Sequence, residues 1–160
     1  MRSSLLLSLS CLAAATLLLA CSEDGSPAAP QDPRPSLVNS DVLVDGVSVA
    51  GMTVSHENGE STMFRAHVTD PRGLGQIRAV YVRYNRPMGM HGRQGVVELH
   101  DDGHGCDGVA GDGDFCHEDH GEGAGCHGDG AASGDYDYDF WCEDQDGHDS
   151  NHQHHTVHMQ

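Results

Sequence analysis

The segment that decides the fold is YDYDFWC, residues 136–142, in which aromatic residues alternate with aspartates from position 136 to position 140. Successive side chains of a β-strand point to opposite faces of the sheet, so the aromatic residues at 136, 138 and 140 share one face with Cys142. The aspartates on the other face require solvent. The segment therefore predicts a half-buried strand whose aromatic face packs on a core.

Segments with similar patterns surround this strand. In residues 62–68, Phe64, Ala66 and Val68 alternate with Arg65 and His67. Turn signals such as Asn-Gly and Asp-Pro separate the segments, and no convincing amphipathic helix occurs. Six to eight strands with this spacing predict an all-β protein built as a β-sandwich. The other predicted strands lie at 42–54 (one bent strand or two short ones), 77–84, 95–100 and 154–159.

Four motifs give the domain a family resemblance. They are VTDPRGLGQIRAVYV at 68–82, VVELHDDG at 96–103, GVAGDGDF at 108–115 and YDYDFWCEDQDG at 136–147. In this order they resemble bacterial extracellular immunoglobulin-like domains, over about residues 60–160. The resemblance implies an immunoglobulin-like antiparallel β-sandwich, and it concerns fold rather than activity. The chain departs from the family pattern between Cys116 and Gly134, where a loop insertion rich in Gly, Asp and His replaces a simple hairpin.

The amino-terminal residues have the pattern of an export signal. Arg2 precedes an apolar run at 5–20 that is too short to span a bilayer comfortably. The run ends in Leu-Leu-Ala-Cys at 18–21, which resembles the lipobox of bacterial lipoproteins. The resemblance implies that Cys21 carries a diacylglycerol and becomes the first residue of the mature protein. The alternative is an ordinary signal peptide with a cysteine near its end.

This segment sets the expected organisation and location of the chain. We expect a signal peptide at 1–20, a lipidated cysteine with a proline-rich disordered tether at 21–36, and the β-sandwich domain at 37–160. Acyl chains hold a protein on a membrane without a spanning segment. Ser22 replaces the Asp that favours inner-membrane retention, so we expect the bacterial cell envelope, at the outer membrane or cell surface.

The charge of the chain excludes one class of partner. The 160 residues include 25 Asp and Glu against 8 Arg and no Lys, a formal net charge of −17. This charge repels nucleic-acid phosphates, so no nucleic acid is expected to bind. The expected contact is with the membrane, through the lipid, and the sequence identifies no protein or surface partner.

Four cysteines remain after the signal and Cys21, namely Cys106, Cys116, Cys126 and Cys142. An even number in an exported chain favours two disulfides, and four cysteines allow three pairings. A faint internal repeat, GCDGVAGDGDFC beside GCHGDGAASGDYDYDFWC, favours pairing 106 with 116 and 126 with 142. A zinc site of thiolates and nearby histidines is the competing interpretation.

Residues 94–160 contain 17 Asp and Glu and ten His, but no Lys or Arg. Carboxylates without local cations favour metal binding, and glycine turns let several carboxylates converge in the oxygen-rich shell that Ca²⁺ prefers. The same Asp-Gly pattern is also ordinary turn chemistry, and its spacing fits no EF-hand. The candidate Ca²⁺ ligands are Asp101, Asp102, Asp107, Asp112 and Asp114.

The histidines suggest a second kind of metal site, for Zn²⁺ or Cu²⁺. If residues 153–159 are extended, His152, His154 and His158 lie on one face and His155 lies on the other. His117 and His120 are further candidate ligands. The alternative is that these histidines serve as the polar face of strands and loops.

Catalysis has little support. The chain has no nucleophile elbow, HExxH helix, P-loop or dinucleotide fingerprint, so we expect no enzyme. The sequence predicts a cell-envelope lipoprotein whose non-catalytic immunoglobulin-like domain is structural, adhesive or captures divalent metal. The alternative is a dedicated zinc- or copper-binding envelope protein that uses the His-rich C-terminal half.

Overall fold

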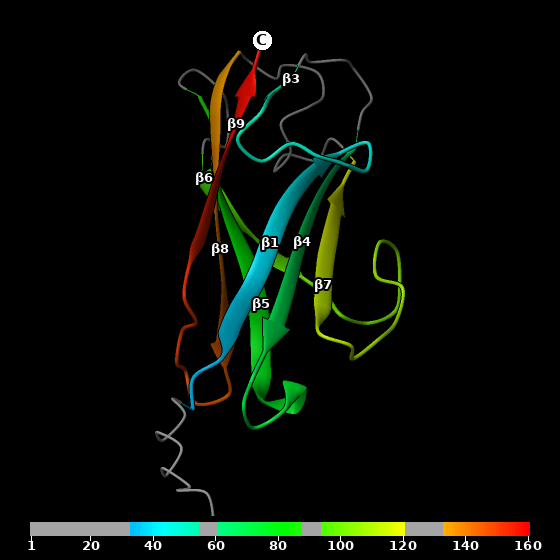
Figure 1. The fold of residues 1–160 in the computed structure, drawn as a ribbon, viewed down its shortest axis with the longest axis vertical. Helices are drawn as coiled ribbons and strands as arrows, with labels where there is room; N and C mark the ends of the chain where they lie inside the picture. Colours follow the sequence, from blue (N-terminus) through cyan, green and yellow to red (C-terminus); the bar gives the residue numbers. More distant parts are fainter. Residues whose placement is uncertain (1–32, 55–60, 88–93, 121–132) are drawn as a thin grey trace, which may run out of the picture. The chain divides into compact units, whose positions relative to one another are not determined.

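A computed structural model describes residues 33–54, 61–87, 94–120 and 133–160 (Figure 1). These residues form an all-β unit, and their helical content is one 3-10 turn at Leu74–Gln76. None of their helices has the length and apolar character that crossing a membrane requires. The expected signal peptide, lipidated Cys21, most of the tether and Cys126 lie outside the described residues.

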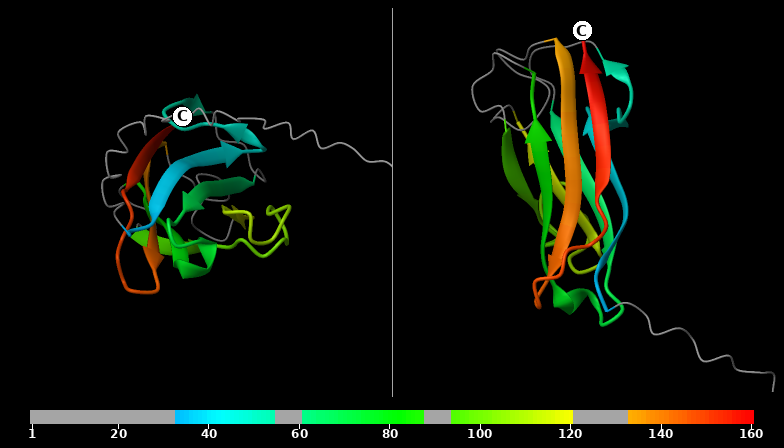
Figure 2. Two further views of the ribbon diagram at one scale, coloured as in Figure 1. Left: turned by 60° about the horizontal axis from the view of Figure 1, so that its bottom comes forward. Right: turned by 90° about the vertical axis from the view of Figure 1, so that its left-hand side faces the viewer.

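The strands form two sheets, visible as two layers in Figures 1 and 2. Pairing is antiparallel except between β3 and β9, which run parallel. The four-stranded sheet contains, in spatial order, β2 (Val47–Ser48), β1 (Ser36–Val44), β4 (Thr62–Thr69) and β7 (Asp114–Asp119). The five-stranded sheet contains β3 (Thr53–Val54), β9 (Gln153–Met159), β8 (Gly134–Asp144), β5 (Ile77–Asn85) and β6 (Gln94–Leu99).

Buried and more exposed residues alternate strictly along the two central strands, β4 and β8, as the sequence pattern predicts. In β4, every second residue from Thr62 to Val68 is buried, and in β8 the same holds from Tyr136 to Asp144. These buried faces meet between the sheets, because a strand with one apolar face is stable only when that face is covered. The predicted strands at 62–68 and 136–142 are thereby confirmed, and the protein is all-β as predicted.

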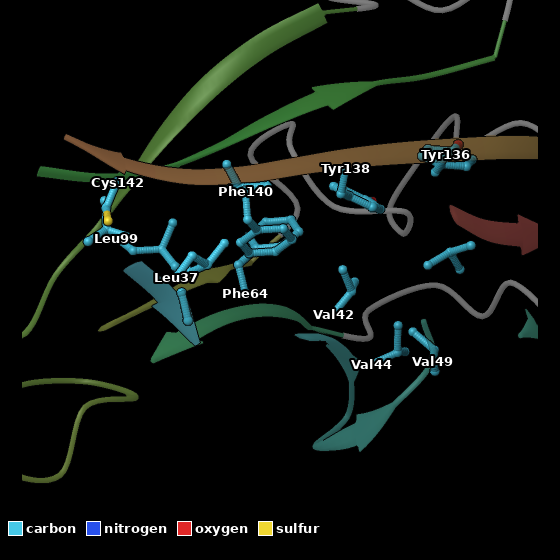
Figure 3. Packing of buried hydrophobic residues seen from close by; sticks show 14 of the residues in the cluster. Leu37, Val42, Val44, Val49, Phe64, Leu99, Tyr136, Tyr138, Phe140 and Cys142 are labelled. Atoms are coloured by element: carbon cyan, nitrogen blue, oxygen red, sulfur yellow. The ribbon is translucent and has the colours of Figure 1, made fainter. Parts of the chain in front are cut away.

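The core lies between the two sheets. Phe64 of β4 is fully buried, and its ring lies 5.2 Å from the ring of Tyr138 and 6.3 Å from that of Phe140, both on β8. Figure 3 shows these rings together, with Leu37, Leu99 and Cys142 grouped nearby. Aromatic pairs at such separations contribute beyond the area they bury. The single cluster therefore joins the two layers.

The structure differs from the sequence prediction at two strands. Residues 116–119, expected to begin the loop insertion, belong to β7, which pairs with β4 from Thr62 opposite Asp119 to His67 opposite Asp114. The strand predicted at 42–54 is instead the end of β1 followed by β2 and β3. β1 starts at Ser36 and extends through the polar residues 39–41, because its backbone pairs with β4 along its whole length.

Candidate metal-binding site

The loop between β6 and β7 is closed on itself. His100 and Cys116 form a β-bridge with backbone hydrogen bonds of 2.9 and 3.0 Å, and Cys106 is disulfide-bonded to Cys116. Gly113 near the end of the loop has φ of 91°, and a Cβ there would lie 2.9 Å from the carbonyl oxygen of Val68. Only glycine fits this approach, so the loop returns to the sheet at a fixed point.

Three carboxylates converge inside this loop. Asp101, Asp107 and Asp112 each place an oxygen within 4.8 Å of the others. Asp107 is buried, with 7% of its surface exposed, while Asp112 is exposed. Oxygens spaced in this way can surround a hard cation such as Ca²⁺ with few adjustments. The three residues form the candidate calcium site.

Backbone amides hold two of these carboxylates in place. The oxygens of Asp101 accept hydrogen bonds from Gly111 and, at 2.9 Å, from Gly113. Asp107 accepts them from the amides of Gly103, at 2.6 Å, and Val109, at 3.2 Å. These bonds are the turn chemistry expected for Asp-Gly sequences. They also fix the carboxylates without help from a cation, so the oxygens are preorganised for one.

The other two predicted calcium ligands lie elsewhere. The Asp102 carboxylate bonds to the amide of His104, and Asp114, the first residue of β7, lies 2.6 Å from the ring Nδ1 of His67. In the part of the chain that the structure describes, no ion pair involves Asp101, Asp107 or Asp112. The structure thus brings together three of the five, and none of the three is ion-paired with a described side chain.

A second acidic group has the geometry of a metal site, but an arginine side chain already pairs with its carboxylates. Asp144, Asp146 and His148 also place ligand atoms within 4.8 Å of one another. The guanidinium of Arg72 bonds to Asp144 and to Asp146, both at 2.5 Å, and it contacts Asp70 at 3.3 Å. The arginine occupies the position that a metal would need, so this group is an ion-pair network. The sequence analysis did not anticipate it.

Asp144 is the centre of that network. Its side chain is fully buried, and burial by itself disfavours ionisation. The backbone amide and ring of His148 and the guanidinium of Arg72 outweigh that effect and lower the pKa of Asp144 to about 2. The carboxylates of Asp70, Asp146 and Asp144 in turn raise the pKa of Arg72 above its ordinary value. Both partners are therefore fully charged at neutral pH.

The histidines of β9 and His152, which directly precedes it, are divided between the two faces, as predicted. His152 and His154 both approach Asp139 of β8, with Nδ1 to carboxylate distances of 2.9 and 3.3 Å. His158 pairs separately with Asp135 at 2.6 Å. His155 faces inward, 2.8 Å from the Ser40 hydroxyl, and burial lowers its pKa.

The five predicted histidine ligands do not form one site. His158 comes four positions after His154, which is about 13 Å along an extended strand. His117 lies on β7, in the other sheet, and His120 follows that strand, 3.8 Å from Glu118. The structure brings together only His152 and His154.

Aromatic rings extend from these histidines across the outer face of the five-stranded sheet. The Trp141 ring stacks on His152, with 5.6 Å between centroids and 7° between planes, and it lies 5.2 Å from the Tyr81 ring. His152 in turn stacks on His154, and the Arg83 guanidinium lies 5.0 Å from the centre of the Trp141 ring. The faces of Trp141 are thus occupied by neighbouring side chains.

The cysteines match the prediction in part. The Cys106–Cys116 disulfide is confirmed, with Cα atoms 6.0 Å apart. Cys142, expected to pair with Cys126, is instead a free thiol that is completely buried in the core. Burial raises the pKa of Cys142 to about 11, so the thiol stays protonated at neutral pH and is not reactive. The pairing that the internal repeat predicted for Cys142 is wrong, because this residue lies on the inward face of β8 with Tyr138 and Phe140 and packs in the core.

Comparison of the chain with protein-family models and with curated proteins finds no match to either. The candidate site therefore rests on the loop's own geometry.

Proposed function

We propose that the protein is a lipid-anchored protein of the bacterial cell envelope whose non-catalytic, immunoglobulin-like domain captures Ca²⁺ in the β6–β7 loop. The observation that carries the proposal is the convergence of Asp101, Asp107 and Asp112 within 4.8 Å in a disulfide-closed loop. The segment from residue 94 to the end of the chain has no Lys or Arg that could neutralise them. A divalent cation relieves the repulsion among these carboxylates.

The strand order supports the immunoglobulin-like part of the proposal. β4 pairs with β1 and β7 in one sheet, and β8 lies between β9 and β5 in the other. Immunoglobulin-like sandwiches distribute consecutive strands between two sheets in the same way, with Greek-key connections. The lipobox-like sequence that ends at Cys21 supports the lipid anchor and the envelope location.

Calcium titrated into the metal-free full-length protein is expected to bind at one site, measured by calorimetry. Asp107→Asn is expected to weaken this binding by about tenfold or more, because it removes the buried charge of the candidate site. Asp146→Asn is the matched control, since it removes an acid that contacts Arg72 instead. Equal weakening by both variants, or affinity no higher than that of a generic acidic peptide, would contradict the proposal.

Zinc or copper capture is the second candidate function, and one observation favours it. The Nδ1 atoms of His152 and His154 both approach the same oxygen, Oδ1 of Asp139, at 2.9 and 3.3 Å. Two imidazoles and a carboxylate are a ligand set that suits Zn²⁺. In this case the outer face of the five-stranded sheet, rather than the β6–β7 loop, is the functional surface.

Zinc titration separates the two candidates. If Zn²⁺ binds on this face, His152→Ala and His154→Ala are each expected to weaken it by about tenfold or more, whereas His158→Ala leaves it unchanged, because His158 lies about 13 Å away along the strand. The measurement is calorimetry, and chemical shifts of the imidazole protons identify the ligands. Equal sensitivity to all three substitutions would indicate diffuse binding and would exclude this site.

A further inference from the structure

A pocket lies between the β6–β7 loop and the outer face of the four-stranded sheet. Its volume is about 550 Å³, within the range of about 300–1,000 Å³ that is usual for small-molecule sites. Side chains of the sheet line one side, and the loop residues Asp107, Val109 and Asp112 line the other. Two residues of the candidate calcium site therefore also belong to the pocket.

Strand register explains the sheet side of the pocket. Asn39 of β1, His67 of β4 and Asp114 of β7 lie opposite one another in one row, and Asp41 lies opposite Arg65 in the next. In β4 the residues on either side of Arg65 are buried, so Arg65 and His67 point away from the core. The two rows place donors and acceptors side by side on one surface.

Arg65 is the unusual member of this surface. Among the described residues it has no ion-pair partner, although the chain has three times more acids than bases. Asp41, directly opposite, uses Oδ1 to accept hydrogen bonds from the Ser48 hydroxyl at 2.7 Å and from the amide of Val42 at 2.8 Å. The guanidinium donors of Arg65 are therefore available to a ligand in the pocket.

The charges of the pocket select the class of ligand. His67 and Asp114 are paired at 2.6 Å, and the charges of Arg65 and Asp41 balance. With Ca²⁺ on Asp107 and Asp112, the remaining surface carries charges of both signs and is rich in donors and acceptors. An anion would meet Asp41 and Asp114, and a cation would meet Arg65 and the metal, so neither is favoured. A neutral ligand with many hydroxyl groups pairs with all of these groups.

We propose that this pocket binds a neutral sugar, held by Arg65, Asp41 and Asn39 on the sheet side and by the metal-bearing loop on the other. Val109, which is 61% exposed, supplies apolar surface for the C–H face of a sugar ring. Trp141, the other aromatic candidate for such a role, is already stacked. The calcium contribution to this sugar site rests on the proposed function, whereas the pocket and Arg65 do not.

An array of immobilised neutral, acidic and amino glycans, probed with labelled full-length protein in calcium, tests the proposal. A neutral glycan is expected to bind, and its uronate and amino-sugar counterparts are expected to bind more weakly. Calorimetry with that glycan should show a loss of about tenfold or more for Arg65→Ala, since hydrogen bonds to a charged group are lost. Arg78→Ala, an exposed arginine paired with Glu143 on the other sheet, should leave binding unchanged.

Each outcome decides one point. No binding to any neutral glycan, stronger binding of a charged counterpart, or full affinity in Arg65→Ala would overturn the sugar site, whether or not calcium binds. Calcium is titrated separately, without glycan, so failure of the metal site is recognised independently. If calcium does not bind but Arg65→Ala weakens glycan binding, the result supports a sugar site in the pocket that works without a metal. An unchanged urea midpoint of Arg65→Ala establishes that the variant is folded.

Discussion

Phe64→Ala is expected to lower the free energy of unfolding by about 3–5 kcal/mol. Phe64 has no exposed surface and contacts Tyr138 and Phe140 across the two sheets. Its removal leaves a cavity at the point where the layers are joined, and the strands on either side are fixed by their hydrogen bonds, so they collapse only partly. Urea denaturation of the full-length protein, analysed with a common m-value, measures the change.

Val96→Ala is the matched control for this core substitution. Val96 lies on β6 and is 54% exposed, so its truncation is expected to change the stability by no more than about 0.5 kcal/mol. A loss below about 1 kcal/mol in Phe64→Ala would mean that the sheets close over the missing ring. In that event the aromatic cluster would not be the main contact between the layers.

The strands with a clear hydrophobic pattern were predictable, as the matches at β5, β6 and β9 also show, whereas β7 was not. β4 and β8 alternate residue by residue, so their faces follow from the sequence alone. β7 reads DFCHED, and its burial pattern places Asp119 inside at 3% exposure. No hydrophobic period marks this strand. Its place depends on pairing with β4, a contact between residues about fifty positions apart that local sequence does not encode.

The acidic loop was predictable in composition but not in detail. Asp-Gly turns predict that carboxylates gather, and the gathering of Asp101, Asp107 and Asp112 agrees with this. Asp114 leaves the group because it is the first residue of β7, where it faces His67 of the neighbouring strand. The ion-pair network of Arg72 could not be predicted from the sequence, because Asp144 and Asp146 are more than seventy residues from Arg72 along the chain.

Asp144→Asn is expected to lower stability at neutral pH and to remove part of its dependence on acid. The pKa of Asp144 is about 2 in the folded protein, below the value of about 3.9 in an unfolded chain. The unfolded state therefore binds more protons between these values, and stability falls as the pH falls. The contribution of Asp144 is complete above about pH 4 and is lost as the pH falls through about 2.

The measurement is the urea midpoint of the wild type and of Asp144→Asn from neutral pH down to about pH 2. In the interval from about pH 4 to about pH 2, unfolding of the wild type should take up more protons than unfolding of the variant, by up to about one. The difference in stability between the two proteins should therefore shrink toward the acid end. Asp102→Asn, at a side chain that is 59% exposed, should track the wild type throughout.

The pH profile, rather than the loss of stability, decides what Asp144 contributes. An amide in its place can still accept hydrogen bonds from the amides of Asp146 and His148, but it carries no charge for Arg72. If wild type and variant lose stability in parallel on acidification, the carboxylate acts only as a hydrogen-bond acceptor that shapes the turn. If the two stability curves converge, the charge of Asp144 stabilises the fold through Arg72, which leaves the β6–β7 loop, of the two acidic groups found in the described residues, as the one without an arginine partner.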